Sequence, residues 1–599
     1  MYIKEYIKHG LLFSLLLAIS FCYTNCNNYN IVFIQDEYLL TSPKTNWVYY
    51  HDEMILLSIN IKANNIIWKS SIDGYLGTGN HLYLYLEPGL HTITASIQGI
   101  NNSVMVNVNY RSTDEIRNMV TGTPFIVKLR PGTYYPNIAS FESGTLNDFN
   151  VSINANNAKL SDYSFYRTTN SIPLRDIRIE FNESMATENT TRMRATSSAI
   201  SSSISRAINS TTSNGSFFVE STLQNGTPPR LINFTLFHET DTYSLWVDYN
   251  NTVNNSALNY LIAEVNNIFL DVKRIWGDWA DINNDGKITI LVTNVINQEN
   301  RACGFFNPYD FFPRNQDSAS WNFNPYSNEM DVVYLGMPSE FLADPYLYNR
   351  IAATFAHELT HAITFSKKTW GKTDLWNMGD KREILSIDEG LSHLSECLIG
   401  YSISGDNSLF INRFLEGTGH FSLFGRNADG FYDSVGMRGS MMLFLSWLFW
   451  KKGGFGWDSN GNIIDLGGIR FLRTLIESNG TGQDNIGLVF GEDIEHLFHR
   501  MIAEINTQRI LGTKHNGILH PKTGEPVNLF TNMDYYNSIT GYNETIIIPI
   551  SYNDADYARR NVVPWSFVFI NPIVINQEEQ VVLTSKNHTG KVFLNFGLR

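Results

Sequence analysis

IAATFAHELTHAITFSKK, residues 351–368, contains two histidines, His357 and His361, that are four positions apart. In an α-helix, residues with this spacing lie on one face about a turn apart, so both imidazoles can reach the same metal ion. The chain has 14 histidines in 599 residues, and a chance match to the full H-E-x-x-H spacing is expected in roughly one or two per cent of such chains. The stretch therefore predicts a helix that holds a metal ion.

The sequence around this stretch supplies ends for the helix. Asp344 can cap the free amides at its start, and Pro345 is tolerated at the first helical position. Lys367 and Lys368 suit the other end, where the helix dipole favours cations. The histidines are thus expected inside the helix and not in a loop.

Glu358 follows His357 directly and points about 100° away around the helix. It is therefore expected to act as a base that takes a proton from water activated by the ion, and not as a ligand. A catalytic zinc ion needs three protein ligands and one open position. The extended pattern H-E-x-x-H-x-x-G-x-x-H would supply a third histidine, but this chain has Thr364 and Lys367 at the glycine and histidine positions. The metzincin arrangement is excluded, and the third ligand must come from elsewhere.

The downstream segment EILSIDEGLSHLSECLIGY, residues 383–401, offers Glu389 as the third ligand, on a second helix that folds back beside the first. Ser386 and Glu389 also have the spacing of a capping box, in which case the glutamate would only cap the helix. Gly390 costs about 1 kcal/mol inside a helix relative to alanine, which favours close packing of another backbone or of a substrate at this point. Glu383 and Glu396 are weaker candidates for the third ligand.

A helix-borne H-E-x-x-H followed by a second helix with E-G near its start resembles the gluzincin group of zinc peptidases. Five segments, WADINNDGKITILVTNV, ACGFFNPYDFF, SNEMDVVYLG, FAHELTHAITF and DEGLSHLSECLIG, are similar in this order to the hyicolysin family of secreted bacterial neutral metallopeptidases. The resemblance covers about residues 230–510. It implies zinc ligation by His357, His361 and Glu389 and a catalytic base at Glu358. Many gluzincins carry an acidic residue four positions after the glutamate ligand, where this chain has His393, for which we expect a structural role and, as the alternative, contact with the substrate.

Two accessory sites are predicted. Tyr432, in DGFYDSVGMRGSMMLF, is the candidate for an extra donor that stabilises the oxyanion, and packing is the alternative favoured by a chain with 30 tyrosines. Asp281, Asn283 and Asp285 have the opening spacing of a calcium loop, but Val292 occupies the position of the bidentate glutamate, so a complete EF-hand is excluded. A helix-to-strand turn is favoured there over a weak calcium site completed by distant residues.

The net charge, the amino-terminal segment and the cysteines indicate where the protein acts and which partners are excluded. The formal net charge is −14 without a long basic run, which argues against a nucleic-acid partner. Residues 1–26 are typical of an export signal, with an apolar run too short to span a bilayer in the mature protein. Cys26 lies in YTNCNN, which loosely resembles the relaxed lipobox of some bacteria, so the protein is expected to be either secreted or lipid-anchored at the bacterial surface, with neither outcome favoured. Cys303 and Cys397 could form one disulfide.

The expected architecture is multidomain. Residues 28–112 alternate like an antiparallel sandwich and resemble an immunoglobulin-like or PKD-like module with Trp68 in its core. Residues 115–250 stay β-rich around a Ser/Thr-rich loop at 183–216. At 251–515, an amphipathic helix, two strands and several further helices predict an α+β catalytic domain, which the resemblance makes zincin-like. A β-rich segment at 540–599 follows.

The function expected from these features is extracellular zinc-dependent peptide hydrolysis. One alternative is a surface-anchored adhesin or binding protein whose zincin fold is inactive. Another is a different metal hydrolase, such as a zinc amidase or a lipase-like enzyme. The Glu358→Gln change and a protein digest with and without chelator distinguish these alternatives.

Overall fold

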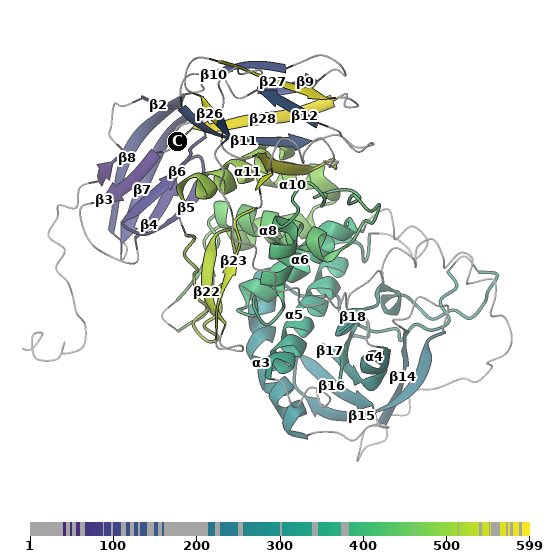
Figure 1. Ribbon diagram of the computed structural model, residues 1–599. Helices are drawn as coiled ribbons and strands as arrows, with labels where there is room; N and C mark the ends of the chain where they lie inside the picture. The colour runs from purple at the N-terminus through teal and green to yellow at the C-terminus, as the bar shows by residue number, and fades with distance from the viewer. Residues whose placement is uncertain are drawn as a thin grey trace, which may run out of the picture.

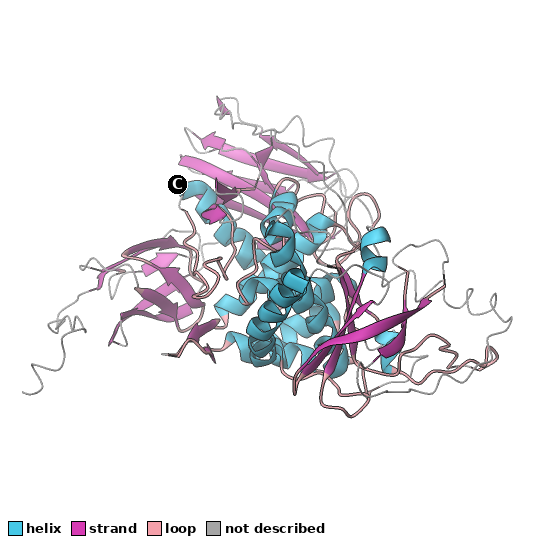
Figure 2. Cartoon of the chain, turned by 90° about the horizontal axis from the view of Figure 1, so that it is seen from below, coloured by secondary structure: helices cyan, strands magenta, loops and turns pink. Residues whose placement is uncertain are grey.

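The computed structural model shows a multidomain α+β protein, in which a central group of helices is surrounded by several β-sheets (Figures 1 and 2). The structure describes residues 40–43, 48–50, 55–59, 66–87, 89–97, 100–109, 115–119, 125–129, 132–140, 149–153, 159–160, 214–221, 228–248, 255–299, 302–320, 322–337, 345–372, 382–458, 460–512, 514–537, 542–549, 551–552, 563–570, 573–575, 579–585 and 590–598. The expected export signal, Cys26, Asp344 and residues 183–213 of the Ser/Thr-rich loop lie outside these ranges.

The first part of the chain forms two sheets that share one hydrophobic core. Their strand orders are β1-β3-β6 and β2-β8-β7-β4-β5. Trp68 is fully buried between them, and its indole N–H donates to the Gly79 carbonyl at 2.7 Å. The strands are β1 (Leu40–Ser42), β2 (Val48–Tyr50), β3 (Ile55–Ile59), β4 (Ile67–Ser70), β5 (Gly74–Thr78), β6 (His81–Leu84), β7 (Gly89–Ile97) and β8 (Ile100–Asn109).

Strands that follow this sandwich pair with strands from the very end of the chain. In one sheet β27 lies between β10 and β12, and in another β11 pairs with β25, β26 and β28. The strands are β9 (Glu115–Met119), β10 (Phe125–Leu129), β11 (Gly132–Ser140), β12 (Phe149–Ile153), β13 (Lys159–Leu160), β24 (Ser551–Tyr552), β25 (Ser566–Ile570), β26 (Ile573–Ile575), β27 (Glu579–Ser585) and β28 (Gly590–Leu598). The segment expected to stand alone at 540–599 therefore shares its sheets with residues 115–160.

A six-stranded mixed sheet, with the order β14-β15-β16-β17-β19-β18, supports the helices that carry the predicted metal ligands. Its central strands β16, β17 and β19 are parallel, and β17 and β19 are buried along their whole length. The strands are β14 (Asn214–Val219), β15 (Arg230–Glu239), β16 (Tyr243–Asp248), β17 (Ile288–Thr293), β18 (Gly304–Phe306) and β19 (Val332–Gly336). The boundary expected at residue 250 falls inside this sheet, because β14 to β16 continue the hydrogen bonding of β17.

Two long helices pack on this sheet. In α3 (Asn255–Trp276), the residues with helical spacing predicted to face inward, from Leu258 to Trp276, are buried apart from the partly buried Ile262. The helix ends before Gly277, whose φ of +93° suits a glycine after a helix. α5 (Pro345–Lys368) lies against α3 and against β18 and β19. Packing against α3 and against the sheet therefore holds the H-E-x-x-H helix in place without a contribution from a metal ion.

The remaining helices cover α5. α6 (Leu385–Leu398) packs between α5 and α8 (Val435–Lys451), and a Cβ on Gly390 would approach Met441 Cγ to 2.4 Å. The glycine thus allows two helices to approach closely, although side chains of α8 occupy the space where another backbone or a substrate was expected. The other elements are α4 (Asn294–Glu299), η1 (Pro308–Phe311), α7 (Asn407–Leu415), β20 (Phe455–Trp457), β21 (Ile463–Asp465), α9 (Gly468–Glu477), α10 (Gly482–Phe490), α11 (Ile494–Leu511), β22 (Met533–Asn537) and β23 (Tyr542–Ile546).

α8 has no separate polar face and is buried from Gly436 to Trp450, as expected of a core helix, although it carries the charged Arg438. None of the helices in the described ranges combines the length and the apolar character that a bilayer crossing requires.

The amino-terminal sandwich is joined to the helices by a buried ion-pair cluster around Arg500 of α11. Its guanidinium lies 2.7 Å from Asp73 Oδ1, 3.1 Å from Glu87 Oε1 and 2.8 Å from Glu492 Oε2. Asp73 and Glu87 belong to the sandwich, whereas Glu492 precedes α11. Close contact continues at Gly74, where a Cβ would come within 1.8 Å of the Lys451 carbonyl oxygen.

We expect Arg500→Leu to destabilise the protein by about 3–5 kcal/mol, because it removes the cation that pairs with the buried carboxylate of Asp73 and with Glu87. Calorimetry should show a lower Tm. The matched control is Arg470→Leu, since the Arg470 side chain is 83% exposed and lies 3.9 Å from Asp465; it should leave the Tm nearly unchanged. Equal Tm values for the two variants would contradict a structural role for the Arg500 cluster.

Candidate metal centre

The two histidines of α5 present their Nε2 atoms to a common point. These atoms are 3.1 Å apart, and the ring centroids are separated by 4.8 Å with an angle of 73° between the planes. His357 is 2% exposed and His361 is 7% exposed. The spacing that suggested a shared ion in the sequence therefore brings both nitrogens together in a buried site.

Glu389 of α6 completes this group. Its Oε2 lies 3.4 Å from His357 Nε2, and its Oε1 lies 3.8 Å from His361 Nε2. Nitrogen and oxygen ligands held tetrahedrally at 2.0–2.1 Å from one zinc ion are separated from each other by about 3.3–3.4 Å. The three side chains therefore fit a single ion, and their donor atoms all lie within 4.8 Å of one another.

The capping role considered for Glu389 is not the one that the structure shows. The residue before α6 is Ile384, which makes no side-chain capping hydrogen bond. Glu389 lies one turn into the helix, is 6% exposed and faces α5 and α8. The predicted second helix thus folds back beside the first with its carboxylate at the histidines.

Each histidine is oriented by a carboxylate at its other ring nitrogen. His357 Nδ1 lies 2.6 Å from Glu396 Oε1, and His361 Nδ1 lies 3.1 Å from Asp388 Oδ2. A carboxylate at Nδ1 favours the tautomer that leaves the Nε2 lone pair available to a metal ion. Glu396, a weaker candidate for the third ligand, therefore contacts the other ring nitrogen of His357 and not the Nε2 side.

A second group of potential ligands, His357, His393 and Glu396, is better explained as a hydrogen-bond network. The 2.6 Å contact between His357 and Glu396 is direct, which leaves no room for an ion between them. His393 Nδ1 lies 2.9 Å from Asn407 Oδ1, and Asn407 Nδ2 donates to Glu396 Oε2 at 3.2 Å. His393 is completely buried, with its ring 4.7 Å from that of His357. These contacts support the structural role expected for His393.

Arg438 of α8 pairs with the carboxylate of Glu389, at the same oxygen that lies nearest His357. Its NH1 lies 2.9 Å from Glu389 Oε2, and its Nε and NH2 form a bidentate pair with Asp433. Burial by itself would raise the pKa of Glu389, but the charges of Arg438 and the two histidines hold this pKa well below its ordinary value. Glu389 therefore remains a carboxylate, the form that binds a metal ion.

The acidic surroundings also act on His361. Burial disfavours its protonated form, but Asp388, Glu389 and Glu358 outweigh that effect and raise its pKa to about 9. The site thus attracts positive charge, and a metal ion would replace a proton on this ring. Glu358 itself is 5% exposed and occupies the helix position after His357, within electrostatic reach of His361.

Other predicted residues lie outside this group. Tyr432 precedes α8, is 42% exposed and has the Arg426 guanidinium 4.3 Å from its ring centroid. No hydrogen bond joins it to the three ligands in the described part of the chain. Glu383 pairs with Lys368 at 3.2 Å and accepts the Gly482 amide, so it ties helices together and is not a ligand.

The proposed calcium loop forms a turn between α3 and β17. Asp281 accepts hydrogen bonds from the amides of Asp285 and Gly286 at 3.1 and 2.9 Å, and Asn283 donates to Asp285. These contacts account for the turn without an ion, and calcium binding there stays a prediction. Cys303 and Cys397 are free thiols, so the structure does not contain the disulfide considered for them.

Three residues of the site were missed in the sequence, namely Asp388, Asp433 and Arg438. The sequence could have indicated a role for Arg438, because it is the single charge in the apolar run GMRGSMMLF, which is buried. A buried charge requires a partner of opposite charge. Asp388 directly precedes Glu389, but the sequence does not show that it faces His361. The chain matches no protein-family model and no curated protein.

We expect Glu396→Gln to weaken metal binding about 10- to 100-fold, because the neutral amide no longer supports His357 as a carboxylate does. Competition with a chelator of known affinity measures this change. Glu416→Gln is the matched control, since its side chain is 49% exposed and lies 3.2 Å from Arg413 on the surface of α7. An unchanged affinity in the Glu396 variant would show that the hydrogen bond does not support a ligand.

Arg438→Met should lower the Tm of the metal-free protein more than that of the metal-loaded protein. The variant leaves Glu389 and Asp433 buried without their cation, and a bound divalent ion would again compensate Glu389. Thermal unfolding of both variants with and without metal gives the two shifts. Equal destabilisation in both states would mean that Arg438 and the metal ion do not share Glu389.

Proposed function

We propose that the protein is a zinc-dependent hydrolase of peptide bonds. The observation that carries this proposal is the convergence of His357, His361 and Glu389 in one buried group, with Glu358 beside it on the same helix. The order of the two helical motifs adds to it, because it resembles that of gluzincins and of the hyicolysin family. This resemblance supports Glu358 as the catalytic base and a zincin-like domain in the region that contains the six-stranded sheet.

Zinc is the metal that we infer from the donor set. Two imidazole nitrogens and one carboxylate are the three ligands typical of catalytic zinc sites in peptidases, which leave a further position open. Zinc held in this way supplies Lewis-acid polarisation of a carbonyl group and lowers the pKa of water to about 7. Outer carboxylates such as Asp388 and Glu396 are typical of histidine ligands that must keep one orientation.

Glu358 would perform the proton transfers. It accepts a proton from the water that attacks the scissile carbonyl and then donates this proton to the leaving amine, which contributes typically 10²–10⁴-fold to the rate. Arg438 would be a positioning residue, because it holds the carboxylate of Glu389 while Asp433 holds its guanidinium. Tyr432 stays a candidate for an oxyanion donor only if its loop moves toward the ligands.

We further propose that the protein acts outside the cytoplasm on protein or peptide substrates, either secreted or anchored by lipid at Cys26. This part of the proposal is supported only by the signal-like residues 1–26. An inactive adhesin is the main alternative, and a zinc amidase or lipase-like enzyme is the second.

The decisive variant is Glu358→Gln, which should retain zinc and lose about 10²–10⁴-fold in the rate of peptide cleavage. His357→Ala should lose both zinc and activity, and Glu416→Gln should lose neither. Casein cleavage, measured alongside metal content, separates these results. Cleavage by the wild type should stop with chelator and return with zinc. A zinc-loaded wild type that cleaves no peptide bond, or a fully active Glu358 variant, would overturn the proposal.

A further inference from the structure

Three side chains that meet between α3, α5 and α6 form a hydrogen-bonded junction beside the proposed metal centre. They are Trp276 of α3, Thr360 of α5 and Ser395 of α6, and each is completely buried. Ser395 Oγ accepts the Trp276 indole N–H at 2.9 Å and the Thr360 hydroxyl at 2.8 Å. The junction therefore joins the helix that carries both histidines to the helix that carries Glu389, and joins both to α3.

Ser395 is the common acceptor of this junction. A hydroxyl oxygen has two lone pairs, and the donors that use them come from two different helices. Thr360 Oγ1 also lies 2.8 Å from the Ala356 carbonyl oxygen of its own helix. The Trp276 indole N–H can only donate, so it depends on the Ser395 oxygen more strictly than the threonine does.

The junction favours one position of α6 along α5. A helix rises about 1.5 Å per residue, so a slip of α6 by one residue would move Ser395 Oγ away from at least one of its donors. The Trp276 N–H lies in a hydrophobic core, where a donor that loses its acceptor is strongly unfavourable. The arrangement with both hydrogen bonds is therefore favoured over a slipped one, whether or not a metal ion is bound.

The position of α6 decides where its carboxylates lie. Thr360 directly precedes His361, and Ser395 directly precedes Glu396. Neighbouring residues of a helix point about 100° apart, so the junction lies beside the site and not within it. Glu389 is on the same helix as Ser395, about 9 Å along the axis. A shift of α6 at the junction would therefore move the Glu389 oxygens, which lie 3.4 and 3.8 Å from the two histidine nitrogens.

We infer that Ser395 is a positioning residue of the proposed metal centre, which holds Glu389 at the distance from the two histidines that one ion requires. It acts through the position of α6, because its oxygen accepts from residues of α3 and α5 that are not themselves proposed ligands. Ligands of a metal ion have to be placed to within about 0.5 Å. This inference rests on the proposed metal centre but not on the proposed hydrolysis, because metal affinity is measured without a substrate.

Competition between the full-length protein and a chelator of known zinc affinity tests the inference. Ser395→Ala should raise the Kd for zinc about three- to tenfold, because fewer molecules hold α6 in the arrangement that the ion requires. Thr360→Val should raise the Kd in the same direction. The double variant should bind zinc like Ser395→Ala alone, since both changes remove the same contact.

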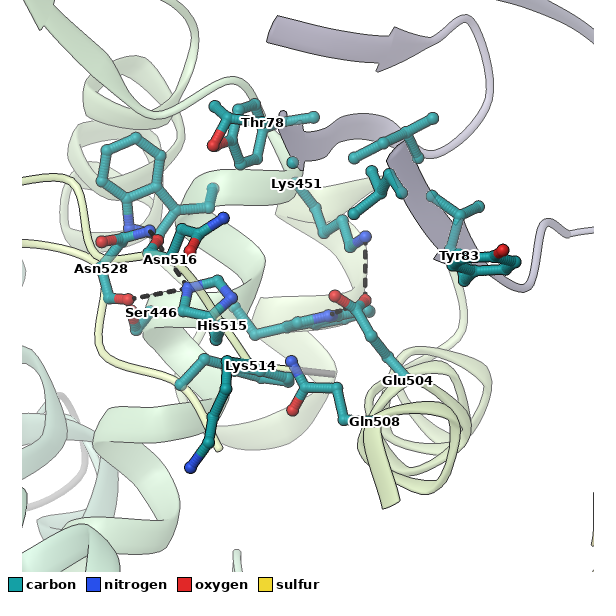
Figure 3. A pocket seen from close by; sticks show the side chains of 18 of the residues that line it. Thr78, Tyr83, Ser446, Lys451, Glu504, Gln508, Lys514, His515, Asn516 and Asn528 are labelled. Carbon is teal, nitrogen blue, oxygen red and sulfur yellow. Dashed lines mark hydrogen bonds and ion pairs between the residues drawn. The ribbon is translucent and has the colours of Figure 1, made fainter. Parts of the chain in front are cut away.

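Three matched variants serve as controls. Ser392→Ala on α6 and Thr364→Val on α5 each remove a buried hydroxyl whose oxygen has no hydrogen-bond partner in the described part of the chain. Ser446→Ala is the remote control on α8, where this buried serine lies on the wall of a cavity of about 250 Å³ between the sandwich and the helices (Figure 3). All three variants should keep the Kd of the wild type.

The inference is overturned if Ser395→Ala binds zinc like Ser392→Ala, even where its Tm is lower, because a merely structural serine would change the Tm without changing the Kd. In that case a wild type that binds zinc leaves the proposed centre standing. A wild type that does not bind zinc overturns both the centre and this inference. If Ser395→Ala does not fold, the comparison of Thr360→Val with Thr364→Val decides the question.

Discussion

The constraint on which the proposed centre depends is an excess of buried negative charge. Glu358, Glu389 and Glu396 are nearly or completely buried, the side chains of Asp388 and Asp433 are 17% and 5% exposed, and Arg438 contacts Glu389 and Asp433. Burying an uncompensated carboxylate is strongly unfavourable. The two histidines relieve part of this charge when they are protonated, and a divalent ion would relieve it without a proton. The acidic group therefore favours a cation at the point where both Nε2 atoms meet, and the helices have to be rigid to keep it there.

This rigidity comes from packing around α8. Gly390 lets α6 approach α8, and Gly439 does the same for α7, since a Cβ there would come within 2.0 Å of the Phe410 carbonyl oxygen. Because α8 is buried on all sides, moving it would disturb contacts in every direction. Arg438 is thus held by its helix, and it holds Glu389 in turn. The proposed ligand from α6 is fixed as firmly as the two proposed ligands from α5, although it comes from a different helix.

Local sequence features predicted the helices and strands near the site, whereas contacts between distant segments were not predictable. Helical spacing predicted α3 and the H-E-x-x-H helix, and the E-G pair indicated that Glu389 lies on a second helix near the histidines. These predictions were possible because each pattern lies within a single helix. The support of His357 by Glu396, two turns beyond Glu389, depends on the angle between α5 and α6, which no periodicity encodes. The pairing of β11 with β28 joins strands more than 400 positions apart, so both ends were expected to fold separately. The roles of Gly74, which allows close contact with α8, and of Arg500, which pairs with carboxylates of the sandwich, likewise depend on the sandwich lying against α8 and α11.

The same helix connects the proposed metal centre to the amino-terminal sandwich. Arg438 is in the first turn of α8, and Lys451, whose carbonyl oxygen faces Gly74 of the sandwich, is in its last, so about 20 Å of helix separates them at 1.5 Å per residue. A change in the sandwich could alter the proposed metal centre only by shifting a helix that is packed on every side. Such a shift would require a free-energy difference large enough to favour a second arrangement of the core. The sandwich is therefore better suited to fix the far end of α8 than to switch the proposed centre on and off.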